Sequence, residues 1–249
     1  MLKGIKKKIV SWIKKEVKDS GRKGLVLGLS GGLDSAVTAV LAKEAVKDNF
    51  LCLILPCESS PEDLNDAHLI AQVFNLPVKN IDLTDVYKKL VEILPSGDRL
   101  SYANLKSRLR MLVLYYFANQ LKYLVCGTSN KSELLTGYFT KFGDGAADIL
   151  PLGDLLKKEV KELAKEIGIP EKIINKAPSA GLWPGQTDEE ELGITYRELD
   201  DILERLEKKR RGNFSSKKIK KVETMMKNSE HKRRLPKICV IKKRGGRDG

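Results

Sequence analysis

Short apolar runs alternate with longer amphipathic segments through the first 126 residues. The apolar runs are strand-sized, and they cover residues 24–29, 50–56, 77–81 and 123–126. Between them apolar residues recur every three or four positions, which predicts helices over 33–47, 61–74 and 101–120. Strands that alternate with helices predict an α/β fold, a doubly wound parallel sheet with helices on both faces.

Two of the helical segments have a recognisable apolar side. Residues 1–20 predict an amphipathic helix that docks on the core or on a partner subunit, with lysines between its apolar positions Ile5, Ile9, Trp12, Ile13 and Val17. In the segment 101–120, the residues expected to face inward are Leu105, Leu109, Leu112, Val113 and Tyr116.

The chain changes character after Gly127. Residues 128–153 are rich in glycine and mixed charges, and residues 177–186 combine prolines with glycines. Long irregular segments inside a compact domain are usually lids or binding loops, so we expect 136–150 and 176–186 to close over a ligand. Without repeats or low-complexity linkers, residues 1–249 are expected to form one domain.

Composition adds a basic C-terminal segment to this picture. Lys+Arg number 46 against 33 Asp+Glu, and residues 205–249 carry a net charge of +14 whereas the remainder carries −1. The near-neutral body argues against a nucleic-acid-binding module, so nucleic acid is not an expected partner. No apolar stretch approaches the ~18 residues of a membrane span. Four cysteines without a C-x-x-C pair suggest reduced thiols in a cytoplasmic protein.

The segment between the first strand and its helix carries the candidate chemistry. It reads Gly28-Leu29-Ser30-Gly31-Gly32-Leu33-Asp34-Ser35. The adjacent glycines allow a tight turn whose N–H groups, with the following helix N-terminus, suit a phosphate or pyrophosphate. A carboxylate beside phosphate is repelled unless a cation lies between them, so Asp34 points to bound Mg²⁺. These features predict a pyrophosphate loop after the first strand of a Rossmann-like fold.

Three other known sequence motifs are alternatives for this loop. Gly28-x-Ser30-x-Gly32 formally matches a hydrolase nucleophile elbow, but that elbow normally follows several strands and needs a histidine partner. The dinucleotide fingerprint G-x-G-x-x-G fails because Ser30 replaces its second glycine. A Walker-type G-x-x-x-x-G-K-[ST] motif is missing from the chain.

Residues 30–35 resemble the pyrophosphate loop of the N-type ATP pyrophosphatases, which cleave ATP to AMP and pyrophosphate while adenylating a substrate. Further segments are similar to those of NAD synthetases within that group. They are Asn104-Leu105-Lys106-Ser107-Arg108-Leu109-Arg110, Gly127-Thr128-Ser129-Asn130-Lys131-Ser132-Glu133, residues 136–148, residues 176–193 and His231-Lys232-Arg233. The resemblance runs in order from about residue 24 to 236.

This resemblance implies a role for each matching residue. The ATP-binding residues would be Gly28, Leu29, Ser30, Gly31, Gly32, Leu33, Asp34, Ser35, Thr128, Lys157 and Ser179. Asp34 and Glu133 would bind Mg²⁺, and Asp34 and Lys157 would act in catalysis. The residues that contact deamido-NAD would be Arg108, Lys141, Asp148, His231 and Lys232. From the residues alone, a solvated lysine at Lys157 and a helix cap at Ser179 are the favoured interpretations. Asp148 could likewise be a turn former and Arg108 a helix-surface arginine.

The resemblance also implies the reaction. The nicotinate carboxylate of deamido-NAD would attack the α-phosphorus of ATP, and ammonia would then convert the acyl-adenylate to the amide of NAD. Only about 23 residues precede the first strand, too few for a glutaminase domain, so free ammonia is the expected nitrogen donor. A homodimer with deamido-NAD near the subunit interface is expected. The alternative is another adenylating pyrophosphatase, such as a tRNA-modifying enzyme.

Overall fold

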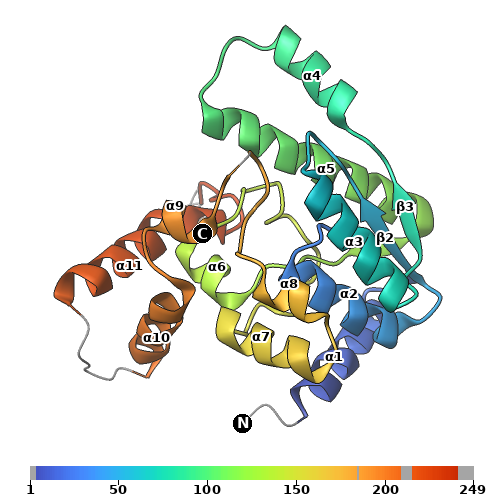
Figure 1. The fold of residues 1–249 in the computed structure, drawn as a ribbon, viewed down its shortest axis with the longest axis horizontal. Coiled ribbons are helices and arrows are strands. Elements are labelled where there is room, and N and C mark those ends of the chain that lie inside the picture. Colours follow the sequence, from blue (N-terminus) through green and yellow to red (C-terminus); the bar gives the residue numbers. More distant parts are fainter. Residues whose placement is uncertain (1–3, 184, 209–214, 241–249) are drawn as a thin grey trace, which may run out of the picture.

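A four-stranded parallel sheet forms the centre of the molecule (Figure 1). The computed structural model describes residues 4–183, 185–208 and 215–240. The strands are β1 (Gly24–Gly28), β2 (Phe50–Ile54), β3 (Val78–Asn80) and β4 (Tyr123–Val125), in the spatial order β3-β2-β1-β4. Every pair in the sheet is parallel, with Val26 opposite both Leu51 and Val125. All four predicted strands and the parallel α/β class are therefore confirmed, with slightly shorter ends.

Helices lie between and after the strands. They are α1 (Ile5–Asp19), α2 (Leu33–Val46), α3 (Pro61–Val73), α4 (Thr84–Ile93), α5 (Arg99–Leu121), α6 (Lys131–Thr136), α7 (Lys157–Glu166), α8 (Glu171–Asn175), α9 (Asp188–Leu192), α10 (Tyr196–Glu207) and α11 (Ser216–Asn228). A short 3₁₀ turn, Glu230–Lys232, follows α11. Among the described residues, none of these helices is long and apolar enough to cross a membrane.

Alternating side chains of the strands enter two separate cores. In β1, Leu25 and Leu27 pack with residues of α1, α2, α7 and α8, whereas Val26 packs with residues of α4 and α5 on the opposite face. Because successive side chains of a strand point to opposite faces, this pattern confirms helices on both sides of the sheet. A third cluster joins residues of α9, α10 and α11 away from β2 and β3 (Figure 1).

The N-terminal amphipathic helix is confirmed as α1, which packs against α2. Its buried side is formed by Ile9, Val10, Ile13 and Val17. Trp12, which the spacing placed on that side, is 38% exposed. Val10 takes the inward position because it lies three residues before Ile13 on the same helix face.

The inward face predicted for α5 is partly wrong. Leu112 is 67% and Tyr116 is 61% exposed. The buried side of α5 instead consists of Ala103, Lys106, Ser107, Met111, Leu114 and Ala118. Apolar residues occur on both sides of this helix, so helical periodicity alone does not distinguish the core face from the outer face.

Several helices were not predicted. Among them are α4 and α6, and α6 begins inside the glycine-rich stretch after β4. Asn130 starts α6 as a capping box: its side chain accepts a hydrogen bond from the backbone N–H of Glu133, whose carboxylate accepts one from the backbone N–H of Asn130. The single-domain organisation over 1–249 and a role for the basic segment 205–249 stay predictions, because residues 209–214 and 241–249 lie outside the described residues.

The sheet creates a crevice at the carboxyl ends of its central strands. β1 is followed by α2 and β2 on one side, while β4 pairs with the other edge of β1. Chain connections therefore leave in opposite directions at the β1–β4 pair. In open α/β sheets, ligands bind in the crevice at this switch point.

Candidate active site

A crevice of about 680 Å³ lies at the switch point between β1 and β4. Residues at the end of both strands line it, among them Gly28, Cys126 and Thr128. Residues from later parts of the chain also line it: Ser179 and the lysines Lys157, Lys161, Lys176 and Lys232. The topology thus brings together groups separated by more than half of the sequence.

The glycine-rich loop enters the crevice between β1 and α2. The hydroxyls of its two serines form a hydrogen bond, with Ser30 Oγ 3.0 Å from Ser35 Oγ. Ser35 Oγ also donates a hydrogen bond to the Gly32 carbonyl at 2.9 Å. Gly32 starts α2 without a side-chain cap, so the first-turn N–H groups of that helix remain available to an anion. Gly28, Leu29, Ser30, Gly32, Leu33 and Asp34 line the crevice, as a pyrophosphate loop requires.

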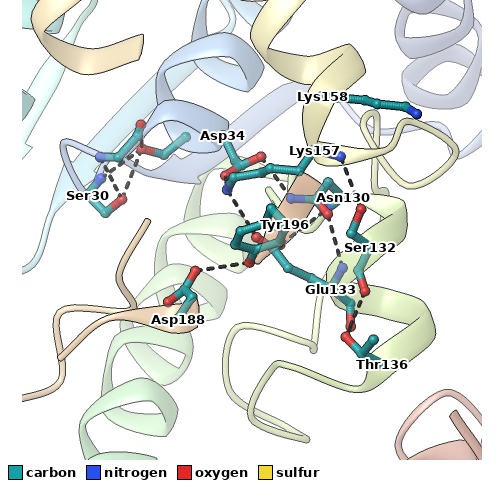
Figure 2. Close-up of polar contacts among 12 residues, drawn as sticks. Ser30, Asp34, Asn130, Ser132, Glu133, Thr136, Lys157, Lys158, Asp188 and Tyr196 are labelled. Atoms are coloured by element: carbon teal, nitrogen blue, oxygen red, sulfur yellow. Dashed lines mark hydrogen bonds and ion pairs between the residues drawn. The ribbon is translucent and has the colours of Figure 1, made fainter. Parts of the chain in front are cut away.

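Asp34, Glu133 and Lys157 converge on one point of the crevice (Figure 2). The ammonium of Lys157 forms an ion pair with Asp34 Oδ2 and lies 3.4 Å from Glu133 Oε1. Only 5% of the Lys157 side chain is exposed, against 15% for each carboxylate. Lys157 is therefore a buried partner of the two acids, and its interpretation as a solvated lysine is wrong.

The pKa values of this cluster reflect burial and charge. Burial, and then the negative charge of Asp34, raise the pKa of Glu133 to about 8. Burial alone would lower the pKa of Lys157, but the charges of Asp34 and Glu133 outweigh it and raise the pKa above its ordinary value. The raised pKa of Glu133 shows that one ammonium does not fully offset the charge of two buried carboxylates.

The cluster fits a divalent cation. Mg²⁺ is usually held by one or two carboxylates together with phosphate oxygens and waters rather than by an all-protein cage. Asp34 and Glu133 supply that number of carboxylates beside the phosphate-binding loop. Within the described residues, no group of three acidic, histidine or cysteine side chains is placed to hold a metal alone. The donors therefore match a cation that also needs phosphate.

Asn130 is a site residue that the sequence reasoning missed. It is fully buried, and its Nδ2 donates to Asp34 Oδ1 at 3.0 Å while its Oδ1 caps α6 (Figure 2). One side chain thus orients Asp34 and starts the helix that carries Glu133. The N-x-x-E pattern of a capping box was the available signal.

Asp200 and Ser132 hold the helix that carries Lys157. Ser132 Oγ donates to Asp200 Oδ1 at 2.5 Å and accepts the backbone N–H of Lys157 at 3.1 Å. The other oxygen of Asp200 accepts the backbone N–H of Lys158 at 2.8 Å. Because Asp200 has no exposed surface, this arrangement fixes the first turn of α7 from inside the protein. Nothing in the local sequence around Asp200 indicates this contact.

Asp188 and Tyr196 form the opposite wall of the cluster (Figure 2). Tyr196 donates its hydroxyl to Asp188 Oδ2 at 3.0 Å, and the Lys157 ammonium lies 5.1 Å from the centre of the Tyr196 ring. Asp188 is buried, and burial raises the pKa of its carboxyl. Asp188 therefore adds a third acid to the surroundings of Lys157.

The two glycine-rich segments pack on α5. Thr140 Oγ1 donates to Asn104 Oδ1 at 2.7 Å, and Ser107 Oγ donates to Asp144 Oδ1 at 2.7 Å, which ties the segment 136–150 to this helix. Lys106 donates to the Leu182 carbonyl at 3.2 Å and so reaches the segment 176–186. Ser179 from that segment and Thr128 from the end of β4 both line the crevice.

The deamido-NAD candidates are distributed differently. Lys232 lines the crevice and donates to the carbonyls of Gly137 and Phe139 at 2.7 and 2.8 Å. Arg108, Lys141 and His231 form a chain outside the lining, because Arg108 Nε donates to the Lys141 carbonyl and Lys141 Nζ to the His231 carbonyl.

Asp148 also lies outside the lining of the crevice. Its carboxylate accepts hydrogen bonds from the backbone N–H of Val125 at 2.7 Å and the Tyr115 hydroxyl at 3.1 Å. These contacts hold the end of β4, so Asp148 has a structural role in this fold.

The fold and the site define a class of protein: an α/β enzyme with a glycine-rich loop at its switch point and a buried acid–lysine cluster beside it. Comparison with known proteins agrees. A family model described as NAD synthase matches residues 5–236. The NH(3)-dependent NAD(+) synthetase of Syntrophomonas wolfei is 48% identical over 240 residues, which cover 94% of each chain. The chain belongs to the NAD synthase family and is a ligase.

Solved structures show the same fold. A structure described as NMN synthetase from Francisella tularensis superimposes with a TM-score of 0.90 at 39% identity, covering 97% of this chain and 99% of that one. An NH3-dependent NAD synthetase from Campylobacter jejuni superimposes with a TM-score of 0.84 at 32% identity, covering 96% and 99%. The resemblance drawn from the motifs is therefore confirmed at the level of family and fold.

Proposed function

We propose that the crevice between β1 and β4 is where this chain carries out the reaction of its family, the ATP-dependent amidation of deamido-NAD with ammonia to NAD, AMP and pyrophosphate. The observation that carries this assignment is the buried Asp34–Lys157–Glu133 cluster beside the glycine-rich loop. Pyrophosphate leaves with several negative charges, and preorganised positive charge at that place stabilises the transition state.

ATP binds with its phosphates on residues 28–35. The N–H groups at the start of α2 and the hydroxyls of Ser30 and Ser35 cradle the β- and γ-phosphates. Lys157 lies close enough to Asp34 to contact the same phosphates, with Thr128 and Ser179 reaching them from the end of β4 and the segment 176–186. Lys157 moves from the carboxylates toward phosphate oxygens when ATP is present.

Asp34 and Glu133 would hold Mg²⁺ beside the phosphate-binding loop. When bound, Mg²⁺ supplies Lewis-acid neutralisation of the phosphate charge. Asn130 keeps Asp34 directed at that position through its 3.0 Å hydrogen bond. Asp200 and Ser132 keep the first turn of α7, and hence Lys157, in register with the loop.

The residues of the crevice then favour two successive nucleophilic displacement steps, adenylation and amidation. The nicotinate carboxylate attacks the α-phosphorus, so that a carboxylate–phosphorus bond forms as the bond to pyrophosphate breaks. Lys157 and the N–H groups of the loop stabilise the departing charge. Ammonia next attacks the activated carbonyl carbon, loses a proton and expels AMP. The segments 136–150 and 176–186 exclude the water that would hydrolyse the adenylate.

The assay that tests this assignment uses the purified chain with ATP, Mg²⁺, ammonium and deamido-NAD. NAD must form with equal amounts of AMP and pyrophosphate, and glutamine must not replace ammonium. Nicotinate mononucleotide is assayed in parallel, because a structural relative is described as an NMN synthetase. Preference for the mononucleotide, or release of ADP and phosphate, would contradict the assignment. A cytoplasmic location stays a prediction.

The outer face of α5 supports the proposed homodimer. Arg108, Leu112 and Tyr116 are spaced four residues apart, so they form one exposed stripe on this helix. Large exposed apolar side chains in a row favour contact with a protein surface, and a second copy presents the same stripe across a two-fold axis. Arg108 lies on this stripe, and its contact with Lys141, which in turn contacts His231, supports a deamido-NAD site near the proposed interface.

Leu112→Asp tests the dimer. A charge in the centre of an apolar interface is strongly unfavourable, so the sedimenting mass is expected to fall by half and the KM for deamido-NAD to rise. Sedimentation equilibrium and initial rates measure both effects. Val73→Asp, at a 52% exposed position at the end of α3, is the matched control and should leave the mass unchanged. A dimeric Leu112→Asp variant would contradict this interface.

Lys232→Ala tests the dinucleotide site. Lys232 is half-buried and lines the crevice, and burial lowers the pKa of its ammonium, an environment that suits pairing with a ligand anion. Its loss should weaken the binding of deamido-NAD by about 1–3 kcal/mol and so raise the KM for deamido-NAD. The KM for ATP should change little. Initial rates with each substrate varied in turn give both constants. Lys237→Ala, at an exposed position five residues later, is the control.

A further inference from the structure

A second buried carboxylate lies in α3, outside the cluster around Asp34. The Asp66 side chain has no exposed surface, and two lysines reach it: Lys172 Nζ lies 2.6 Å from Oδ1 and Lys176 Nζ 2.6 Å from Oδ2. Burial alone would raise the pKa of Asp66, but hydrogen bonds from Lys172 and Lys176 outweigh it and lower the pKa. Asp66 is therefore a charged anchor for α8, which lies beside α3 (Figure 1).

Lys176 connects two carboxylates of α3 at once. Besides Asp66, its ammonium lies 2.7 Å from Asp63 Oδ1, one turn earlier on the same helix. Lys172 pairs with Asp66 and keeps 55% of its side chain exposed, whereas the Lys176 side chain is 21% exposed and lines the crevice. The two lysines thus differ in their access to the site.

The same turn of α3 is pressed against the glycine-rich loop. Gly31 has a positive φ of 81°, and a Cβ at this position would lie 2.3 Å from the Asp63 carbonyl oxygen and 3.0 Å from the Ala67 nitrogen. Only glycine allows such an approach. The position of α3 therefore determines where the loop lies.

Lys176 also begins the segment that covers the crevice. This segment closes on itself, because the backbone N–H of Asp188 donates to the Pro178 carbonyl at 3.0 Å. It rests on α3 as well, since a Cβ on Gly181 would lie 3.3 Å from Asp63 Oδ2. The turn of α3 from Asp63 to Ala67 thus contacts the phosphate loop on one side and the covering segment on the other.

We propose that Asp66 and Lys176 are positioning residues for adenylation: their ion pair sets the segment 177–183, which carries Ser179, at a fixed distance from the glycine-rich loop, so that both close on one ATP molecule. The inference rests on the proposed ATP site for the identity of the nucleotide. A pair that only stabilised the fold would lower the Tm without selectively changing nucleotide binding.

The kinetic test compares Asp66→Asn, Lys176→Met and Lys172→Met with the unmodified chain. Asp66→Asn and Lys176→Met are each expected to raise the KM for ATP ~10-fold or more, as expected for losing hydrogen bonds between charged groups. The KM for deamido-NAD should change little, and Lys176→Arg should restore part of the ATP affinity. Lys172→Met, which removes a half-exposed partner of the same carboxylate, should stay within about twofold.

A fluorescence test reports on the segment itself. The chain has two tryptophans, so a Trp12→Phe background leaves Trp183 as the sole tryptophan, within the segment. Titration with ATP and Mg²⁺, without deamido-NAD, should change the emission of Trp183. In the same background, Lys176→Met should shift this change to ~10-fold higher ATP or abolish it, and Lys172→Met should not.

Several results would overturn the inference. One is an unchanged KM for ATP and an unchanged Trp183 titration in Lys176→Met. Another is a raised KM in Lys176→Met but not in Asp66→Asn, because Lys176 would then contact ATP directly. If Asp66→Asn does not fold, Asp63→Asn removes the other carboxylate on Lys176, and the same outcomes decide. Failure of the unmodified chain to form AMP and pyrophosphate would instead overturn the proposed function.

Discussion

Replacing Asp34 or Glu133 with alanine is expected to lower kcat by ~100-fold or more, the scale on which a preorganised electrostatic stabiliser acts. Both carboxylates are 15% exposed and share the Lys157 ammonium at the phosphate end of the crevice. Removing either one would take away a proposed ligand for Mg²⁺ and leave Lys157 with one of its two carboxylate partners. Turnover at saturating ATP, deamido-NAD and ammonium measures the effect.

The Mg²⁺ dependence separates a lost ligand from a lost fold. Each variant should need a higher Mg²⁺ concentration for half-maximal activity, while deamido-NAD still binds and the Tm shows a folded protein. Asp48→Ala, at a fully exposed carboxylate just after α2, is the control and should retain the activity of the unmodified chain. Near-normal turnover of Asp34→Ala or Glu133→Ala at moderate Mg²⁺ would show that the carboxylate is not a ligand.

Lys157→Met is expected to lower kcat ~10²–10³-fold, with most of the loss in the adenylation step. The ammonium of Lys157 is paired with both acids, and its side chain is 5% exposed. Methionine approximates the length of the aliphatic part of the lysine side chain but carries no charge, so it cannot stabilise departing pyrophosphate. Exchange of labelled pyrophosphate into ATP, without ammonium, isolates the adenylation step.

The neighbouring lysine offers a matched control for this variant. Lys158 follows in the same helical turn but points to the surface, where it lies 3.0 Å from Asp201 and 3.1 Å from Glu204. Surface ion pairs contribute little, so Lys158→Met should change turnover by no more than about twofold. Equal losses in the two variants would show that the effect arises from the stability of α7 rather than from charge in the crevice.

Local sequence pattern determined the framework of this protein. Strand-sized apolar runs and 3.6-residue periodicity depend on interactions within a few residues, and they predicted all four strands and α1, α2, α3 and α5. The glycine-rich loop could also be predicted from the local sequence, because its tight turn, the helix N-terminus and Asp34 are contiguous in the chain. The motifs along the chain also identified the family, which the comparisons confirm.

Tertiary structure decided which side chains meet. Lys157 and Asp34 are 123 residues apart, and Asn130 and Asp34 are 96 apart, so no local pattern pairs them. Their meeting depends on β4 lying beside β1. Leu112 and Tyr116 were wrongly predicted to face inward, because both sides of α5 are apolar and only packing on the sheet selects one. Burial of Lys157 and Asp66 depends on the same packing, since a lysine or aspartate is buried only where the fold supplies its partner.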